Sequence, residues 1–256
     1  MKITMNYPST YQHSDYKCTV VIDIGLAQEQ EKNCGLVVAK KSARGEIFPL
    51  EVSQEDFTQA RRKIFDLLKF YGGDPSGFAL VIEAPLSVQF ENNSPKERSF
   101  IRSDMSTFSE SSYRWYAPIG ASVMAGAVIL IKSLFMEATE AKHSDVPCST
   151  INLFEAFSVN KGAVTEENAV TFIQANRVSY EESLSIMKGT GKRKVIHDWV
   201  DATYIMSALI KNGENLCHVR RPDKNSLGFV KSICEFFRLD DHKSSSEIPS
   251  VVYLKY

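Results

Sequence analysis

The sequence predicts an α/β fold with a mixed five-stranded sheet, made of a three-stranded antiparallel meander and two parallel strands, and flanked by helices. The first indication is an apolar strand pattern at 17–25, followed by strand patterns at 33–41 and 45–52. The second is a helical pattern that leads from this meander to another apolar strand at 78–83. Because a strand reached through a helical crossover runs parallel to the earlier one, we expect the strand at 78–83 to lie beside the first.

The links between the first three predicted strands indicate an antiparallel meander. The first 16 residues show no clear period and are expected to be coil or a loosely attached arm. The polar link at 26–32 suits a wide turn to the second strand. Gly45 ends the short link to the third strand, which predicts an antiparallel hairpin.

The helices are predicted from caps and apolar faces. Ser53 is the expected N-cap of the first helix, with Asp56 at the third helical position of a capping box. A strongly apolar helix expected to be well buried follows at 120–139. The remaining predicted elements are a fifth strand at 150–157, helices at 165–187, 198–211 (ended by Asn212 and Gly213) and 229–239, and an edge strand at 251–253.

The domain organisation predicted is a single domain over 1–256. An irregular insertion rich in Arg and aromatic residues occupies about 86–117, where we expect a flap that faces the substrate. A C-terminal extension begins at about 214.

Composition narrows the classes of protein. A chain of 256 residues with 43% hydrophobic residues is expected to be soluble, and its polar start does not look like a signal peptide. We expect no apolar run of membrane-spanning length, and we expect a cytoplasmic location. The net charge of −1 excludes a globally basic nucleic-acid-binding surface but not local basic patches. The five cysteines, without a C-x-x-C pair, indicate reduced thiols.

Four acids have positions that suggest chemistry. Asp23 and Glu83 end the two strands expected to be parallel neighbours, so both should emerge at one edge of the sheet. Asp198 and Asp201 are three residues apart and share one face of a late helix. Carboxylates suit hard divalent cations such as Mg²⁺, so the four residues predict a divalent-metal site. Structural roles remain open: Asp23 could cap a turn, and Asp198 stabilises a helix dipole in any case.

These motifs resemble the RNase H-like superfamily of metal-dependent nucleases over roughly 17–212. The D-x-x-D-A spacing of Asp198 and Asp201 is similar to RuvC-type Holliday-junction resolvases, which are shorter, more basic and without a counterpart of the insertion. The Glu-Ala-Pro turn and the strand around Glu155 are closer to an uncharacterised family of predicted RNase H-like nucleases. The resemblance implies two-metal hydrolysis of nucleic-acid phosphodiester bonds, with Asp23, Glu83, Asp198 and Asp201 as catalytic metal ligands.

Other side chains are candidates for supporting roles. Phosphates could be bound by Arg114 and by the basic segment directly before the late helix, although such a segment can also be a solvated loop; its residues are Lys188, Lys192, Arg193 and Lys194. Glu155 and His197 are candidates for orienting the ligands from behind, while packing is the simpler role for His197. The partner is expected to be DNA or RNA, and the sequence does not distinguish them.

Two other functions compete with the nuclease. A non-catalytic binding protein could keep the RNase H fold. An actin-like ATPase or kinase would share the strand order, but it needs Gly- and Thr-rich phosphate loops that are missing after Gly25. The oligomeric state is open, and a homodimer is compatible with the sequence.

Overall fold

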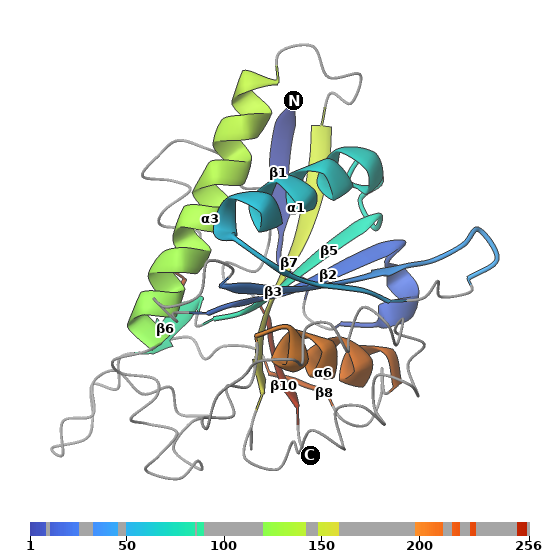
Figure 1. Ribbon diagram of the computed structural model, residues 1–256. Coiled ribbons are helices and arrows are strands. Elements are labelled where there is room, and N and C mark those ends of the chain that lie inside the picture. The colour runs from blue at the N-terminus through green and yellow to red at the C-terminus, as the bar shows by residue number, and fades with distance from the viewer. Residues whose placement is uncertain are drawn as a thin grey trace, which may run out of the picture.

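The computed structural model has an α/β fold in which one mixed sheet carries helices on both faces (Figure 1). It describes residues 1–8, 11–25, 33–45, 50–84, 86–89, 120–141, 148–158, 198–211, 217–220, 226–228 and 250–254. The helices are α1 (Phe57–Tyr71), α3 (Gly120–Glu140) and α6 (Asp198–Lys211), with a short 3-10 turn, η1 (His13–Asp15). The strands are β1 (Lys2–Asn6), β2 (Cys18–Ile24), β3 (Cys34–Lys40), β4 (Glu51–Glu55), β5 (Phe78–Glu83), β6 (Ser87–Gln89), β7 (Cys148–Ser158), β8 (Cys217–Arg220), β9 (Ser226–Gly228) and β10 (Ser250–Leu254).

The middle of the sheet has the predicted meander and parallel strands. The strand order is β4-β3-β2-β5-β7, with β2, β3 and β4 antiparallel and β2, β5 and β7 parallel. Gly45 adopts a φ of 80° in the turn after β3, a conformation that glycine adopts without strain. The predicted α/β class and the placement of β5 beside β2 are therefore confirmed.

The outer part of the sheet is larger than predicted. β7 is 11 residues long, and one of its edges pairs in parallel first with β1 and then with β10. The prediction of coil before residue 17 is therefore wrong for β1, whose residues Ile3 and Met5 are buried. Five residues are too few for their alternation to stand out in the sequence, and pairing with β7 determines the conformation.

The C-terminal segments also join the sheets. β10 forms a strand as predicted, but it is not an edge strand because it lies between β7 and β8. β6 lies inside the predicted irregular insertion and pairs with β9 in a separate two-stranded sheet. The helices predicted at 165–187 and 229–239, the turn at 26–32 and the cap at 212–213 lie outside the described residues.

The first helix begins three residues later than predicted. Ser53 belongs to β4, where it pairs with Leu36 of β3, so the third strand is shifted from 45–52 to later residues. Asp56 is the N-cap, and its Oδ1 accepts a hydrogen bond of 2.8 Å from the amide of Gln59. Both residues are good caps, and strand pairing decides between them.

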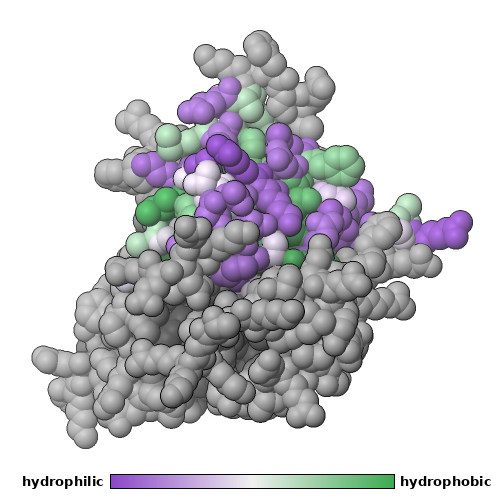
Figure 2. Space-filling model, in the orientation of Figure 1, coloured by the Kyte–Doolittle hydropathy of each residue, from purple (hydrophilic) through white to green (hydrophobic). Residues whose placement is uncertain are grey.

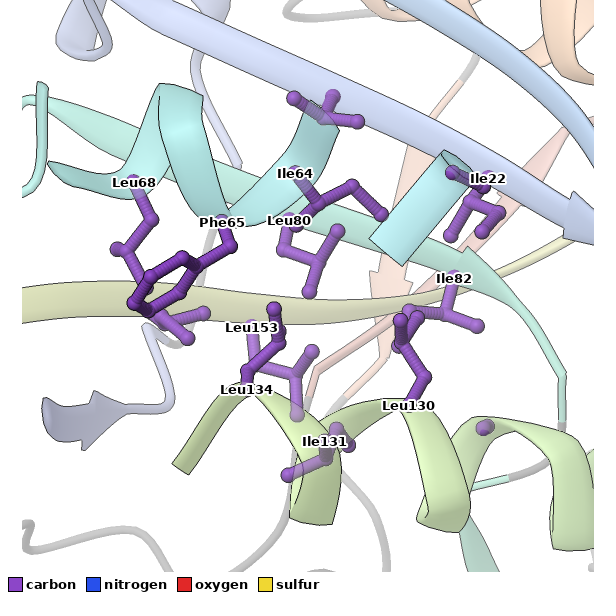
Figure 3. Packing of buried hydrophobic residues seen from close by; sticks show 14 of the residues in the cluster. Ile22, Ile64, Phe65, Leu68, Leu80, Ile82, Leu130, Ile131, Leu134 and Leu153 are labelled. Atoms are coloured by element: carbon purple, nitrogen blue, oxygen red, sulfur yellow. The ribbon is translucent and has the colours of Figure 1, made fainter. Parts of the chain in front are cut away.

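One face of the sheet packs against α1 and α3 in the larger of two hydrophobic layers. Even-numbered residues of β2 and β5, such as Ile22 and Leu80, point into this layer because side chains alternate along a strand. Figure 3 shows side chains of both helices meeting those of the strands; the labelled ones are Ile22, Ile64, Phe65, Leu68, Leu80, Ile82, Leu130, Ile131, Leu134 and Leu153. The side of α1 that faces away from the sheet is polar. In Figure 2, which has the orientation of Figure 1, most of the coloured residues are hydrophilic.

The other face packs against α6. Odd-numbered residues such as Val21 and Val81 belong to this second layer, and five buried residues of α6 cover them: Trp199, Ala202, Ile205, Met206 and Leu209. Further along the same layer, Tyr11 and Tyr16 stack on each other and meet Phe154 edge-on. Both faces of β2 are therefore covered, which explains its continuous apolar pattern.

The apolar helix α3 is long enough to raise the question of a membrane. By length and composition alone, the stretch Ser122–Glu140 is long and apolar enough to cross a membrane, and 39% of its apolar window is buried. The expectation that no apolar run reaches this length is therefore wrong. Core helices of soluble proteins also meet this test. Here Val123, Leu130 and Leu134 belong to the interior layer beneath α1, as the apolar pattern predicted.

A small polar cluster is buried at the start of β2. The hydroxyl of Tyr11 lies 3.0 Å from His13 Nδ1 and 3.0 Å from Thr19 Oγ1. The Lys41 ammonium donates to the backbone carbonyl of His13. Desolvation, with a smaller contribution from Lys41, lowers the pKa of His13 from 6.5 to about 4, so the imidazole is neutral in the folded protein near pH 7.

Replacing Leu80 by Ala should destabilise the protein strongly. Leu80 is fully buried between the sheet and the helices, so the truncation creates a cavity and should lower the free energy of unfolding by about 2–5 kcal/mol. Urea unfolding followed by circular dichroism measures the change. Phe70→Ala is the control, because Phe70 is 79% exposed and its loss should cost less than ~1 kcal/mol. Equal losses in the two variants would contradict the assigned core.

Acid should destabilise the fold through His13. The unfolded imidazole binds a proton below pH 6.5, whereas the folded one does so only near pH 4, so the free energy of unfolding should fall between these pH values. The full contribution is on the order of 3 kcal/mol. His13→Gln keeps a neutral polar side chain and should show a shallower decrease over the same pH range in urea titrations. Parallel curves for the two proteins would show that His13 does not cause the effect.

Candidate metal centre

Asp23 and Glu83 lie side by side on neighbouring strands. They are direct partners in the parallel register of β2 and β5. Paired residues of neighbouring strands project to the same face of a sheet, and both acids share the parity of Val21 and Val81. The two carboxylates therefore belong to the face that α6 covers, and the prediction that they meet at one edge of the sheet is confirmed.

Both acids are buried within the described part of the structure. Asp23 is 6% exposed and Glu83 is 2% exposed. The runs of β-branched and apolar residues before them explain this burial, because they place both strands in the sheet interior. Two neighbouring carboxylates repel each other in a medium of low polarity, and a divalent cation between them would offset that repulsion.

The beginning of α6 lies level with these acids. The backbone amide of Trp199, in the first turn of α6, donates a 3.1 Å hydrogen bond to Oε1 of Gln54. In the sheet register Gln54 pairs with Gly35, Gly35 with Asp23, and Asp23 with Glu83. These four residues form one row across four strands, which we call the acid row. The helix start is attached to one end of the acid row, and the carboxylates lie at the other end.

Asp198 and Asp201 lie in the first turn of α6, the helix that is bonded to Gln54. α6 starts at Asp198, as predicted, and packs on β2 and β3. The backbone of Asp198 and Asp201 is described, whereas their side chains lie outside the described part. The structure thus brings together Asp23, Glu83 and the helix turn that carries the other two predicted ligands.

The structure decides the face of Glu155, which the sequence left open. It pairs with Ile82 rather than Glu83, so it shares the parity of Leu153 and lies on the α1 and α3 face. The side chain is fully buried, and Oε2 accepts a 3.1 Å hydrogen bond from the amide of Leu86. Glu155 therefore supports the backbone that follows Glu83, and it does so from the opposite side of the sheet.

Gln54 is a site residue that sequence reasoning missed. The sequence places it in the first turn of a helix, whereas the structure places it in β4, two residues before the N-cap Asp56. The alternation of the third strand could have indicated its inward position if that strand had been located correctly. The remaining candidates, Arg114, Lys188, Lys192, Arg193, Lys194 and His197, lie outside the described residues.

The described donor set suits a hard divalent cation. Asp23 and Glu83 offer carboxylate oxygens, which Mg²⁺ and Mn²⁺ prefer. Among side chains that the structure describes, no three His, Cys, Asp or Glu residues form a cluster that could hold a metal ion. The described part of the candidate centre therefore consists of two carboxylates.

Removing the Glu155 carboxylate should loosen the segment after Glu83. Glu155→Leu leaves the buried Leu86 amide without its acceptor, which should cost about 1–3 kcal/mol of stability. Glu155→Gln keeps an oxygen acceptor and should lose less. Urea unfolding and hydrogen exchange at the Leu86 amide measure both effects. Unchanged protection of this amide in Glu155→Leu would contradict the assigned support.

Comparisons with known proteins do not assign the chain to a family. No family model, curated protein or solved structure was found that matches it. Its function is therefore inferred from its own residues and their arrangement.

Proposed function

We propose that the protein is a metal-dependent nuclease of RNase H-like fold that hydrolyses nucleic-acid phosphodiester bonds with Mg²⁺ or Mn²⁺. The observation that carries the proposal is the pairing of Asp23 with Glu83 on the face where α6 begins with Asp198 and Asp201. Acids from three separated parts of the chain thus belong to one region of the fold. A purely structural role would not require this concentration of acids.

The sheet order supports the same proposal. A meander followed by two parallel strands, with a late helix over the first strands, is the arrangement that the sequence resemblance implies. The extra strands β1, β8 and β10 extend the sheet beyond β7 and leave the acid row unchanged. Fold alone does not determine activity, so the acids carry the functional argument.

The proposed roles follow from the chemistry of the side chains. Asp23 and Glu83, together with Asp198 and Asp201, would hold the divalent ions. Such ions supply an activated water and stabilise the oxygen that leaves the phosphorus. The basic residues ahead of α6, Lys188, Lys192, Arg193 and Lys194, and Arg114 in the insertion, would bind phosphates of DNA or RNA.

Neutralising either described acid should abolish cleavage without unfolding the protein. Asp23→Asn and Glu83→Gln are nearly isosteric and remove a negative charge, so the melting temperature should not fall. Mn²⁺ affinity should drop at least ~10-fold and cleavage at least ~100-fold, as expected when a metal ligand is lost. Calorimetry measures binding, and end-labelled single-stranded, duplex and branched DNA and RNA report cleavage.

The matched control for these variants is Asp66→Asn. Asp66 is an exposed acid of α1, where it pairs with Lys69 on the face opposite to α6. This variant should bind Mn²⁺ and cleave like the wild type. Full cleavage by Asp23→Asn would refute the proposed function, and Mn²⁺ binding by the wild type without cleavage of any substrate would favour the non-catalytic binding protein.

A further inference from the structure

We propose that Gln54 is a positioning residue, which sets the start of α6 relative to Asp23 and Glu83 and thereby sets the affinity of the centre for divalent cations. This role rests on the proposed function. Gln54 would act through the helix, without contact to the metal or the substrate. The proposal stands on one hydrogen bond, on the strand register and on the packing of α6.

The hydrogen bond joins two elements that are 145 residues apart in sequence. The first four amides of a helix have no acceptor within the helix, and the Trp199 amide is one of them in α6. Oε1 of Gln54 supplies the acceptor at 3.1 Å, in a partly buried position. The strand β4 therefore provides an acceptor for the first turn of α6 from a distant part of the chain.

The strand register gives the approximate distance between Gln54 and Asp23. Gln54 and Asp23 lie two strands apart in the acid row, with Gly35 between them. At roughly 4.8 Å between strands, two steps amount to about 10 Å, which is close to the diameter of a helix. The residue that binds the first turn of α6 therefore lies about one helix diameter from Asp23.

Apolar packing restrains the position of α6 along its axis less sharply than a directional bond does. The buried side chains of α6 determine which side of the helix faces the sheet, but hydrophobic contact is not directional. A hydrogen bond requires a defined distance and angle, so the bond from the Trp199 amide to Gln54 restrains α6 along its axis. A metal site tolerates little displacement of its ligands, and Asp198 and Asp201 are in the turn that Gln54 holds.

Three variants test this role. Gln54→Leu removes the acceptor at similar size, Gln54→Glu retains an oxygen acceptor, and Gln59→Leu is the matched control on the exposed side of α1. Gln54→Leu should raise the Kd for Mn²⁺ at least ~10-fold, lower kcat with little change in KM, and speed amide hydrogen exchange over 198–204. Gln54→Glu should restore slow exchange and tight binding, and Gln59→Leu should match the wild type throughout.

The outcomes separate the two proposals. Wild-type affinity for Mn²⁺ and wild-type exchange in Gln54→Leu would overturn the role of Gln54 alone. Weak binding in both Gln54→Leu and Gln54→Glu, with unchanged exchange in α6, would also overturn it. A wild-type protein that binds no Mn²⁺ would overturn the proposed function, and this role of Gln54 with it.

Discussion

The burial of β2 on both faces is the constraint on which the rest of the structure depends. β2 is paired on both edges, antiparallel with β3 and parallel with β5, and every one of its residues is buried. Because side chains alternate, the parity of a residue decides whether it meets α1 and α3 or α6. The same parity continues across the register into β3, β5 and β7, so one strand organises both layers of the core.

Polar residues within these strands form hydrogen bonds to neighbouring segments of the chain. Asn152 of β7 donates hydrogen bonds to the carbonyls of Pro75 and Phe78 and accepts one from Asn6, which ties β1 and β7 to the turn before β5. The hydroxyl of Thr19 forms a hydrogen bond with the hydroxyl of Tyr11 in the N-terminal segment. Since a buried polar group is costly without partners, such networks select one register of strands among those that apolar packing would allow.

The acid row differs from these networks in its charge. Asp23 and Glu83 place two carboxylates side by side where packing alone would favour apolar residues. Gln54, at the other end of the same row, attaches α6 to the sheet. Glu155 holds the chain after Glu83 from the opposite face. Strand β4, helix α6 and strand β7 therefore all contribute to the region around these two acids. This arrangement is the physical basis of the proposed metal chemistry.

The sequence by itself determined the central strands, the three described helices and the neighbourhood of Asp23 and Glu83. It could do so because long apolar runs and helical periods are local signals, and because crossover rules limit how strands are ordered. Tertiary structure alone decided that β1 is a strand, that Ser53 pairs in β4 while Asp56 caps α1, and that Gln54 reaches α6. It also decided the face of Glu155, because a shift of one residue in register between β5 and β7 reverses the layer that a side chain enters, and register is set by pairing across the sheet.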